Sequence, residues 1–354
     1  MIAPSVLSCR PILRARAALR LGLAGGGTDL SPYCDRFGGA VLNATIDRFV
    51  EATLGVPASS QVRFVDETTH EVWEGPPERA LEGGGRGLAL HRAVYRRCVT
   101  EFQGGRPFPI EIATASEAPL GSGLGASSTL VVAMVAAFVE LWRLGIGRQA
   151  IARLAYEIER CDAKLPGGRQ DHYAAAYGGV NFLEFHANEH VVVTPIAVAP
   201  TIVARLEQSL LLLHTGIARD STAIIIEQQR RVSDGGADDA LGAMHRLKAN
   251  AIRMRASLAR GDFDDFHAAI NESWASKKQT APGISNGVIE SIHTAAMAAG
   301  ASAAKVSGAG GGGFVVMFVE PSRRDHVIRA LGPFEGRVEP CRFAAGGAQV
   351  RREP

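Results

Sequence analysis

The stretch EAPLGSGLGASSTLVVAMVAAF, residues 117–138, places three glycines and several serines directly before a long apolar segment. The apolar segment predicts a helix that is buried on nearly every side. Glycines allow backbone N–H groups to converge on an anion, and the N-terminus of a helix adds partial positive charge. A phosphate-binding loop is therefore one interpretation. A tight turn closed by a serine cap is the other.

The composition limits the classes of protein to which this chain can belong. It has 354 residues, a formal net charge of +2 and 21% charged residues. Because this balance gives no overall basic or acidic field, the sequence predicts neither a nucleic acid nor a membrane surface as partner. No apolar run reaches the roughly 20 residues that a bilayer requires, and the N-terminal arginines do not fit a signal peptide. We therefore expect a soluble, cytoplasmic protein.

Cysteine usage agrees with this expectation. Five cysteines are scattered through the chain, and no two of them form a Cys-x-x-Cys pair. An odd number without ligand spacing predicts reduced thiols rather than a disulfide framework or a zinc site.

The order of predicted elements indicates the fold class. Alternating and β-branched patterns predict strands at residues 39–56, 61–66, 107–115, 180–185, 210–216 and 314–320. Helical periodicity predicts helices at residues 126–143, 148–164, 239–260 and 286–300. This mixed order favours an α+β fold over a regular alternation of strand and helix. We expect two domains, residues 1–204 and 205–354.

Two glycine motifs raise the alternative of a dinucleotide-binding protein. Residues 121–126 read GSGLGA and residues 308–313 read GAGGGG. The first is separated from its preceding strand by a polar segment, and the second opens onto a strand where the fingerprint requires a helix. A Gly-Lys pair, which a Walker A loop needs, is absent from the sequence, as are the protein-kinase HRD and DFG elements.

Three glycine clusters in a fixed order point elsewhere. They are LAGGGTD at 23–29, PLGSGLGASS at 119–128 and KVSGAGGGG at 305–313. This trio resembles the GHMP kinases, the family of galactokinase, homoserine kinase, mevalonate kinase and phosphomevalonate kinase, over roughly residues 14–320. The resemblance implies ATP and Mg²⁺ as cofactors. It also implies a two-domain GHMP-kinase-like fold, with a ribosomal-protein-S5-domain-2-like N-terminal domain and a ferredoxin-like C-terminal domain.

Four longer stretches are similar to the branch of this family that acts on D-glycero-D-manno-heptose 7-phosphate. They are LRLGLAGGGTDLSPY (19–33), GGRQDHYAAAYGGVNF (167–182), LLLHTGIARDST (211–222) and SWASKKQTAPGISN (273–286). The resemblance implies transfer of the ATP γ-phosphoryl group to the anomeric O1 of that sugar phosphate, which gives the 1,7-bisphosphate. The sequence departs from the pattern at Ala18, where proline is frequent, and at His172, where glutamine is more usual.

Two other functions remain open at this stage. One is an anomeric kinase of an unphosphorylated sugar of the heptose, mannose or fucose type. The other is a non-catalytic small-molecule sensor that keeps the fold. The oligomeric state is also open, and a homodimer is possible.

The resemblance implies that the central loop binds ATP. The residues concerned are Gly121, Ser122, Gly123, Leu124, Gly125, Ala126, Ser127 and Ser128. Within this loop Ser127 matches the serine that helps to hold Mg²⁺, and Glu159 matches the carboxylate that completes the metal site. Oxygen ligands of this kind suit a hard cation. Ser128 has a helix cap as its alternative role.

The same resemblance implies a catalytic pair and a sugar-binding loop. Asp171 matches the carboxylate that accepts or orients the proton of the attacking hydroxyl. Arg20 matches the arginine beside it, which stabilises developing charge. Asp29 matches the aspartate that binds sugar hydroxyls, and Gly27 and Thr28 lie in its loop.

Other candidates for the sugar pocket follow from position or charge. Asp47 either joins Asp29 or is an exposed strand residue. A substrate that already carries a phosphate needs cations of its own, and Lys277, Lys278 and Arg169 are the candidates, each with a solvated surface charge as the alternative. The third glycine cluster contributes a second loop near the substrate. Its predicted substrate-binding residues are Gly308, Gly310 and Gly311, whereas Lys305 is expected to be structural.

Overall fold

The computed structural model describes residues 10–82, 88–119, 121–217, 221–233 and 238–353. Its strands form two sheets, one of eight strands and one of four. The first sheet contains β1 (Arg10–Ala24), β2 (Gly39–Val56), β3 (Val62–Asp66), β4 (Glu71–Gly75), β5 (Glu111–Ser116), β6 (Val180–Phe185), β7 (Val191–Pro195) and β12 (Gln349–Arg352). The second sheet contains β8 (Leu210–His214), β9 (Ala301–Val306), β10 (Phe314–Val319) and β11 (Val338–Pro340).

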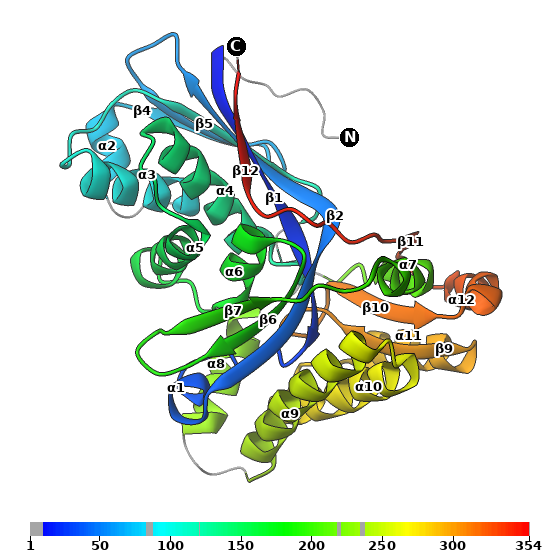
Figure 1. Cartoon of the computed structure of the whole chain (residues 1–354). Helices are drawn as coiled ribbons and strands as arrows, with labels where there is room; N and C mark the ends of the chain where they lie inside the picture. Colours follow the sequence, from blue (N-terminus) through cyan, green and yellow to red (C-terminus); the bar gives the residue numbers. More distant parts are fainter. Residues whose placement is uncertain (1–9, 83–87, 120, 218–220, 234–237, 354) are drawn as a thin grey trace.

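Two long antiparallel strands, β1 and β2, form the backbone of the first sheet (Figure 1). The first half of β2 pairs with β6 and its second half pairs with β5, so the strand connects two parts of the sheet. The pairing of β1 with β2 shifts register between Ala18 and Arg20, and again between Gly22 and Ala24. Such bulges bend a strand and redirect its side chains. They occur at the residues that contribute to the pocket described below.

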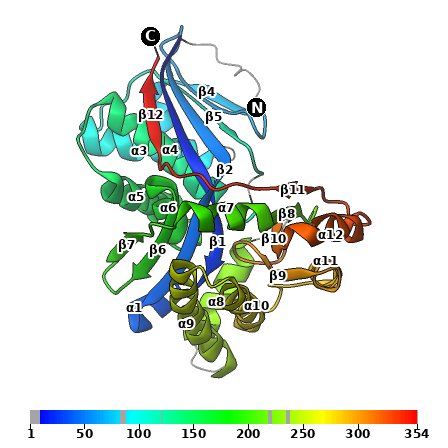
Figure 2. The same ribbon diagram turned by 45° about the vertical axis from the view of Figure 1, so that its right-hand side comes forward.

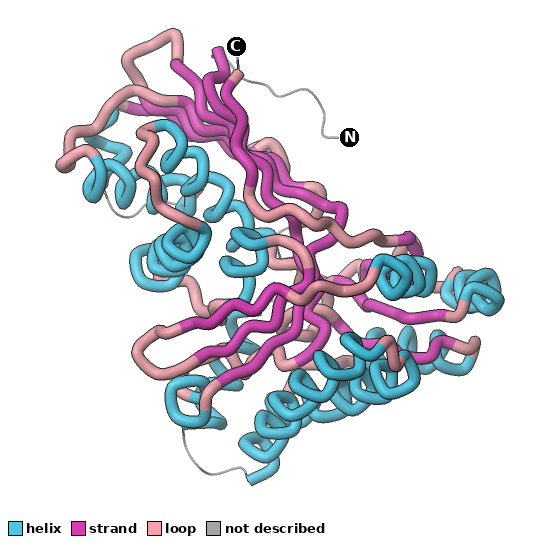
Figure 3. The backbone as a smooth tube through the Cα atoms, viewed as in Figure 1, coloured by secondary structure: helices cyan, strands magenta, loops and turns pink. Residues whose placement is uncertain are grey.

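Helix α4 (Ala126–Leu141) is the centre of the helical layer on one side of this sheet. Its residues from Leu130 to Phe138 are all buried, because an apolar helix is stable only when it is covered on every side. It packs against β1, β2 and its neighbouring helices (Figure 3). The other helices of the layer are α2 (Pro77–Leu81), α3 (Ala89–Phe102), α5 (Arg148–Glu157) and α6 (Gln170–Tyr177). A short helix, α1 (Tyr33–Phe37), lies at the far end of β2.

The second sheet has the antiparallel order β11-β8-β10-β9. With β8 counted as the first strand, this order is 4-1-3-2, which is the ferredoxin-like arrangement named among the sequence expectations. Figure 2 shows this sheet beside the long strands of the first. Its helices are α7 (Pro200–Ser209), α8 (Ser221–Ser233), α9 (Asp238–Arg260), α10 (Phe263–Thr280), α11 (Gly287–Ala298) and α12 (Arg324–Leu331). Helix α9 packs on β1 and β2, and α10 packs on β9, so these helices join the two sheets.

The predicted α+β class is confirmed, and the strand predicted at 39–56 matches β2 in its bounds. The helix predicted at 148–164 is an α-helix from Arg148 to Glu157. It continues as a π-helical turn, Ile158–Asp162. The proposed domain boundary at residue 204 falls inside α7, and β12 returns from the C-terminal half to pair with β1. The division into domains 1–204 and 205–354 stays a prediction, and β12 of the C-terminal half belongs to the first sheet.

Two further properties bear on the sequence expectations. Within the described residues, no helix is both long enough and apolar enough to cross a membrane. Cys34, Cys98, Cys161 and Cys341 are free thiols, as expected, while Cys9 lies outside the described residues.

Candidate active site

A cavity of about 240 Å³ lies where the three glycine clusters meet. Its walls come from both halves of the chain, including α8, α10 and β9 from the C-terminal half. The residues predicted from the sequence that line it are Arg20, Gly27, Asp29, Gly121, Gly123, Gly125, Ala126, Ser127, Glu159, Asp171, Lys277 and Gly308. Most of the predicted site is therefore brought together in one pocket.

The central glycine loop ends at Gly125, the residue that precedes α4. Gly125 has φ of 79°, a left-handed conformation that favours glycine. A Cβ atom added there would lie 3.2 Å from Cγ of Asp171, so the absence of a side chain allows the loop to approach this carboxylate. The loop is fixed through its backbone, because Leu124 O accepts from Arg20 N at 3.0 Å and Ser122 O accepts from Phe314 N at 3.0 Å.

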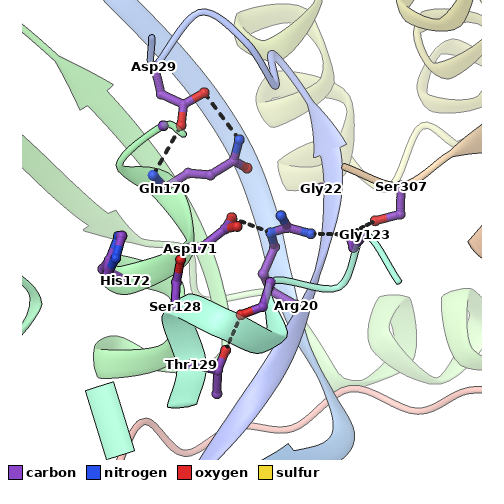
Figure 4. Close-up of polar contacts among 12 residues, drawn as sticks. Arg20, Gly22, Asp29, Gly123, Ser128, Thr129, Gln170, Asp171, His172 and Ser307 are labelled. Carbon is purple, nitrogen blue, oxygen red and sulfur yellow. Dashed lines mark hydrogen bonds and ion pairs between the residues drawn. The ribbon is translucent and has the colours of Figure 1, made fainter. Parts of the chain in front are cut away.

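Arg20 and Asp171 form an ion pair next to this loop (Figure 4). Arg20 Nε donates to Asp171 Oδ1 at 2.6 Å, and Arg20 Nη1 donates to Gly123 O at 2.5 Å. Ser307, at the end of β9, donates its hydroxyl to the same carbonyl at 2.9 Å. Arg20 is buried, whereas the Asp171 side chain is 19% exposed and opens onto the pocket. The carboxylate therefore has one oxygen engaged and is accessible to a substrate.

Asp29 is held differently, by donors on three sides. Its oxygens accept from Gly27 N at 3.0 Å, Gln170 N at 3.1 Å and Gln170 Nε2 at 3.2 Å. These contacts fix a buried carboxylate at the pocket wall, as Figure 4 shows for Gln170. Gln170 was not among the predicted site residues. Its position directly before Asp171 is the sequence feature that could have identified it.

Glu159 lies in the π-helical turn and is buried at the pocket wall. Its Oε2 accepts from Ser128 Oγ at 2.7 Å and from His172 Nε2 at 2.6 Å, and Oε1 pairs with Arg160 at 3.2 Å. Burial alone raises the pKa of Glu159, but Arg160 and the hydrogen bonds from His172 and Ser128 lower it to about 2. Glu159 is therefore an anion at neutral pH. Ser128 does not cap α4, since its hydroxyl binds this carboxylate instead.

These groups fit a magnesium ion. Mg²⁺ is usually held by one or two carboxylates, with water molecules and substrate phosphates completing its octahedral shell. Glu159 and Ser127 both line the pocket beside the glycine loop. Because Ser128 and His172 occupy Oε2, the oxygen of Glu159 with remaining capacity is Oε1.

The structure places several predicted residues outside the pocket. Asp47 is exposed and accepts from Arg342 N at 3.1 Å, which leaves it as a strand residue, the second of its two interpretations. Lys278 pairs with Glu290 at 3.1 Å on the outer side of α10. Arg169 is buried behind the pocket, 3.5 Å from Asp35 and over the Tyr156 ring. The positive charges of Arg169 and Lys278 thus interact with carboxylates of the protein itself, Asp35 and Glu290.

Three residues of the first and third glycine clusters that were predicted to bind substrate do not face the pocket. Thr28 does not face the pocket, because its hydroxyl donates to Gly25 O at 2.7 Å and accepts from Ala40 N at 3.1 Å, which holds the turn of the first cluster. Gly310 and Gly311 pack against Ile284 rather than facing the pocket, and Gly311 N donates to Ile284 O at 2.7 Å. Gly308 remains in the pocket wall, beside Ala309.

Lys305, which was expected to be structural, supports the first glycine cluster and also lies in the pocket wall. Its ammonium lines the pocket and donates to Gly22 O at 2.8 Å and to Leu23 O at 3.0 Å. Burial lowers the pKa of Lys305 to about 7, with contributions from the neighbouring charges of Lys277 and Arg20. The sequence signal was its position at the head of the third glycine cluster, in a strand that leads directly to the site.

A glycine loop at a helix N-terminus, beside a partly exposed carboxylate paired with arginine, is the arrangement of a phosphotransferase that acts on a hydroxyl group. Comparison with known proteins agrees. The model of the GHMP kinases N terminal domain matches residues 89–179, and that of the GHMP kinases C terminal domain matches residues 254–337. The chain is 39% identical to the D-glycero-alpha-D-manno-heptose 7-phosphate kinase of Campylobacter jejuni over 340 aligned residues. The alignment spans 96% of this chain and 99% of that protein. This chain belongs to the GHMP kinase family and is a sugar kinase.

Solved structures support the same conclusion. The chain superimposes on a D-glycero-D-manno-heptose 1-phosphate kinase from Bacteroides thetaiotaomicron with a TM-score of 0.81 and 36% identity. The superposition covers 97% of this chain and 100% of that structure. A sugar kinase structure from Campylobacter jejuni, described as putative in its name, gives a TM-score of 0.78 at 36% identity, with 99% and 100% coverage.

Proposed function

We propose that this protein transfers the γ-phosphoryl group of ATP to O1 of D-glycero-D-manno-heptose 7-phosphate and so forms the 1,7-bisphosphate. The observation that carries the proposal is the Arg20–Asp171 pair, which faces a glycine-rich loop within one pocket. The names of the relatives supply the substrate class. One is named for a heptose 7-phosphate and another for a heptose 1-phosphate, so both names contain a heptose that carries one phosphate.

Asp171 acts as the proton acceptor in this proposal. The anomeric hydroxyl lies against the carboxylate, which takes its proton as the oxygen attacks the γ-phosphorus. Arg20 holds Asp171 through Nε and the loop carbonyl of Gly123 through Nη1, so it fixes the acceptor relative to the ATP loop. The guanidinium also stabilises the negative charge that develops on the transferred group.

The ATP phosphates lie on the loop of residues 121–127. Backbone N–H groups of the loop and the N-terminus of α4 bind them without contributing a net charge. Mg²⁺, when bound, would neutralise charge on the nucleotide phosphates. Ser127 and Glu159 are the groups of this chain that would hold it, and Ser128 and His172 keep the Glu159 carboxylate in place. The reaction takes place in the cytoplasm.

Asp29 orients the sugar. Its carboxylate is fixed by Gln170 and Gly27, and the remaining lone pairs accept hydroxyl protons of the ring. A rigid acceptor of this kind sets the angle at which O1 meets Asp171, which is the positioning contribution to the rate.

Measurement of ADP formation tests the proposal. Mg-ATP is incubated with D-glycero-D-manno-heptose 7-phosphate, free mannoheptose, mannose and fucose, and the product is identified by ³¹P NMR. The expected result is turnover of the 7-phosphate with a new anomeric phosphate signal. Turnover confined to free sugars would keep the kinase and contradict the substrate, and a product without an anomeric phosphate would contradict the site of transfer.

A further inference from the structure

One peptide group of the first glycine cluster, between Gly26 and Gly27, connects a lysine of the C-terminal half to a carboxylate of the N-terminal half. Its carbonyl oxygen accepts from Nζ of Lys277 on α10 at 3.0 Å, and its N–H donates to Asp29 Oδ1 at 3.0 Å. A peptide group is planar and rigid, so displacement of the carbonyl also displaces the N–H. Lys277 therefore acts on Asp29 without touching it.

Glycine at residue 27 is what allows this connection. Gly27 has φ of 107°, a conformation that side chains disfavour and that orients the preceding peptide group relative to Asp29. A Cβ added there would lie 3.0 Å from Nζ of Lys277 and 3.6 Å from Nε2 of Gln228. A side chain at residue 27 would thus strain the backbone and displace the ammonium together.

Lys277 is itself held by a buried amide on α8. Gln228 is 1% exposed, its Nε2 donates to Thr280 Oγ1 at 2.5 Å, and its Oε1 lies 3.5 Å from Nζ of Lys277. The Thr280 hydroxyl has one proton, which it donates to Lys277 O at 2.8 Å, so it must accept from the amide. This fixes the end of the Gln228 amide that faces the ammonium.

The contact from Gly27 affects the oxygen of Asp29 that is left for a ligand. Oδ1 accepts from Gly27 N and from Gln170 Nε2, whereas among the described residues Oδ2 accepts from Gln170 N alone. The donors on Oδ1 fix the rotation of the carboxylate, and this rotation determines where Oδ2 points. Hydrogen bonds in a chain also polarise one another, so an ammonium on the carbonyl strengthens donation by the N–H.

We propose that Lys277 and Gln228 are positioning residues for the sugar, which act on Asp29 through the peptide group of Gly26 and Gly27 rather than through contact with the substrate. Helices α8 and α10 then help to aim a carboxylate that belongs to the N-terminal half. This inference rests on the proposed function, in which Asp29 orients the sugar.

The adjacent lysines 277 and 278 provide a matched test, because Lys278 lies on the outer side of α10. KM for D-glycero-D-manno-heptose 7-phosphate and KM for ATP are measured for the wild type and each variant. We expect Lys277→Met to raise KM for the sugar by roughly tenfold, the scale of one hydrogen bond to a charged group, and to change KM for ATP by less than about twofold. Gln228→Leu should give a smaller change in the same direction. Lys278→Met should change neither KM.

The Asp29→Asn variant separates action through the carboxylate from direct contact with the substrate. In this background Lys277→Met should raise KM for the sugar by less than about twofold, because the carboxylate through which it acts is already absent. The full loss in that background would overturn the inference, since Lys277 would then contact the substrate itself. Equal increases in both KM values, or an unchanged KM for the sugar, would also overturn it. Thermal unfolding of each variant identifies any loss caused by misfolding.

If the wild type does not turn over this sugar, the proposed function fails separately, and urea denaturation tests the connection without substrate. The double variant of Lys277→Met and Asp29→Asn should lose less free energy of unfolding than the sum of the two single losses, because the residues are coupled. Lys278→Met and Asp29→Asn should be additive. Additive losses for Lys277→Met and Asp29→Asn would reject the connection.

Discussion

Two walls of the pocket present different groups to the cavity. The loop wall, residues 121–127, offers backbone N–H groups and the N-terminus of α4, which are dipoles without net charge. The lysine wall, Lys277 and Lys305, offers side-chain ammonium groups, which donate to backbone carbonyls of the first glycine cluster. The loop wall attracts phosphate oxygens without repelling the cation that accompanies a nucleotide. The lysine wall repels such a cation and favours an anion that binds without a metal ion.

Arg20 connects the two walls. It donates to Asp171 and to Gly123 on the loop wall, and its charge acts on Lys305 of the lysine wall. Arg20, which holds the Asp171 carboxylate, therefore contacts one wall and lies near the charge of the other. Substitutions that remove one wall at a time separate their contributions.

Asp171→Asn should have the largest effect, because it disables the centre that both walls serve. We expect kcat to fall by roughly 10²- to 10⁴-fold, the range for a positioned acid–base group, while ATP and sugar phosphate still bind. Steady-state kinetics and calorimetric binding measure the two quantities. A kcat within about tenfold of the wild type, below the range for such a group, would remove Asp171 from the catalytic role.

Gly123→Val should break the loop wall alone. Gly123 has φ of 84°, and a side chain in such a conformation costs of order 1–3 kcal/mol, so ATP binding should weaken by roughly 10- to 100-fold. Sugar phosphate binding should be retained, since the lysine wall is unchanged. Calorimetry with each ligand provides the comparison, and parallel losses in both affinities would show that the two walls are not independent.

His172→Leu should weaken the metal site at the loop wall. Removal of the donor to Glu159 Oε2 leaves a buried carboxylate with one partner fewer, and loss of an outer-shell partner commonly costs 10- to 100-fold in metal affinity. His172→Gln should retain most of the affinity, because its Nε2 can donate in the same place. The Mg²⁺ concentration required for half-maximal activity, and the stabilisation that Mg²⁺ gives in thermal unfolding, are the readouts. Identical behaviour of the two variants would contradict a positioning role.

The lysine wall should make stability depend on pH. Unfolded Lys305 binds its proton below about 10.5, whereas burial and the charges of Lys277 and Arg20 lower its folded pKa to about 7. The free energy of unfolding should therefore increase as the pH rises between these values, by at most about 1.4 kcal/mol per pH unit from this group. Urea denaturation of the wild type and Lys305→Met at pH 7.5 and 9 isolates the contribution. A difference between the two proteins that does not change with pH would rule it out.

Lys278→Met should have the smallest effect. Its ion pair with Glu290 is at the surface, with the two side chains 34% and 44% exposed, and such pairs contribute about 0–1 kcal/mol. Kinetics on the phosphorylated sugar should be unchanged, and the unfolding midpoint should shift by only a few degrees. A large kinetic effect would extend the lysine wall beyond the pocket.

The sequence was sufficient to predict that Gly121, Gly123 and Gly125 meet Arg20 and Asp171 at one pocket, while the roles of these residues stay predictions. These residues lie in short contiguous motifs, and a motif carries its local geometry with it. The same holds for β2, whose β-branched and partly alternating sequence predicts the strand with its observed bounds. The four residues of β12 offered no comparable pattern, because β12 is formed by pairing with β1.

The lysine wall could not be predicted to the same extent. Lys277 and Lys278 are adjacent in the sequence, but successive residues of a helix point about 100° apart, and only Lys277 faces the pocket. The phase of α10, which decides between them, follows from its packing on β9. The two interpretations of Asp47 could not be separated for a similar reason, because strand register and the neighbouring loop place it at the surface. The position of Lys305 in the pocket wall likewise depends on the register of β9.

The π-helical turn at Ile158–Asp162 has a consequence for how this protein is compared with its relatives. A π turn contains one residue more than an α turn over the same rise, which corresponds to a single-residue insertion in an ordinary helix. In a relative that lacks the insertion, counting along the helix would bring a neighbour of Glu159 opposite Ser128. Alignments through this segment should therefore allow a one-residue gap, and the counterpart of Glu159 is better identified by its serine and histidine partners than by its distance along the chain.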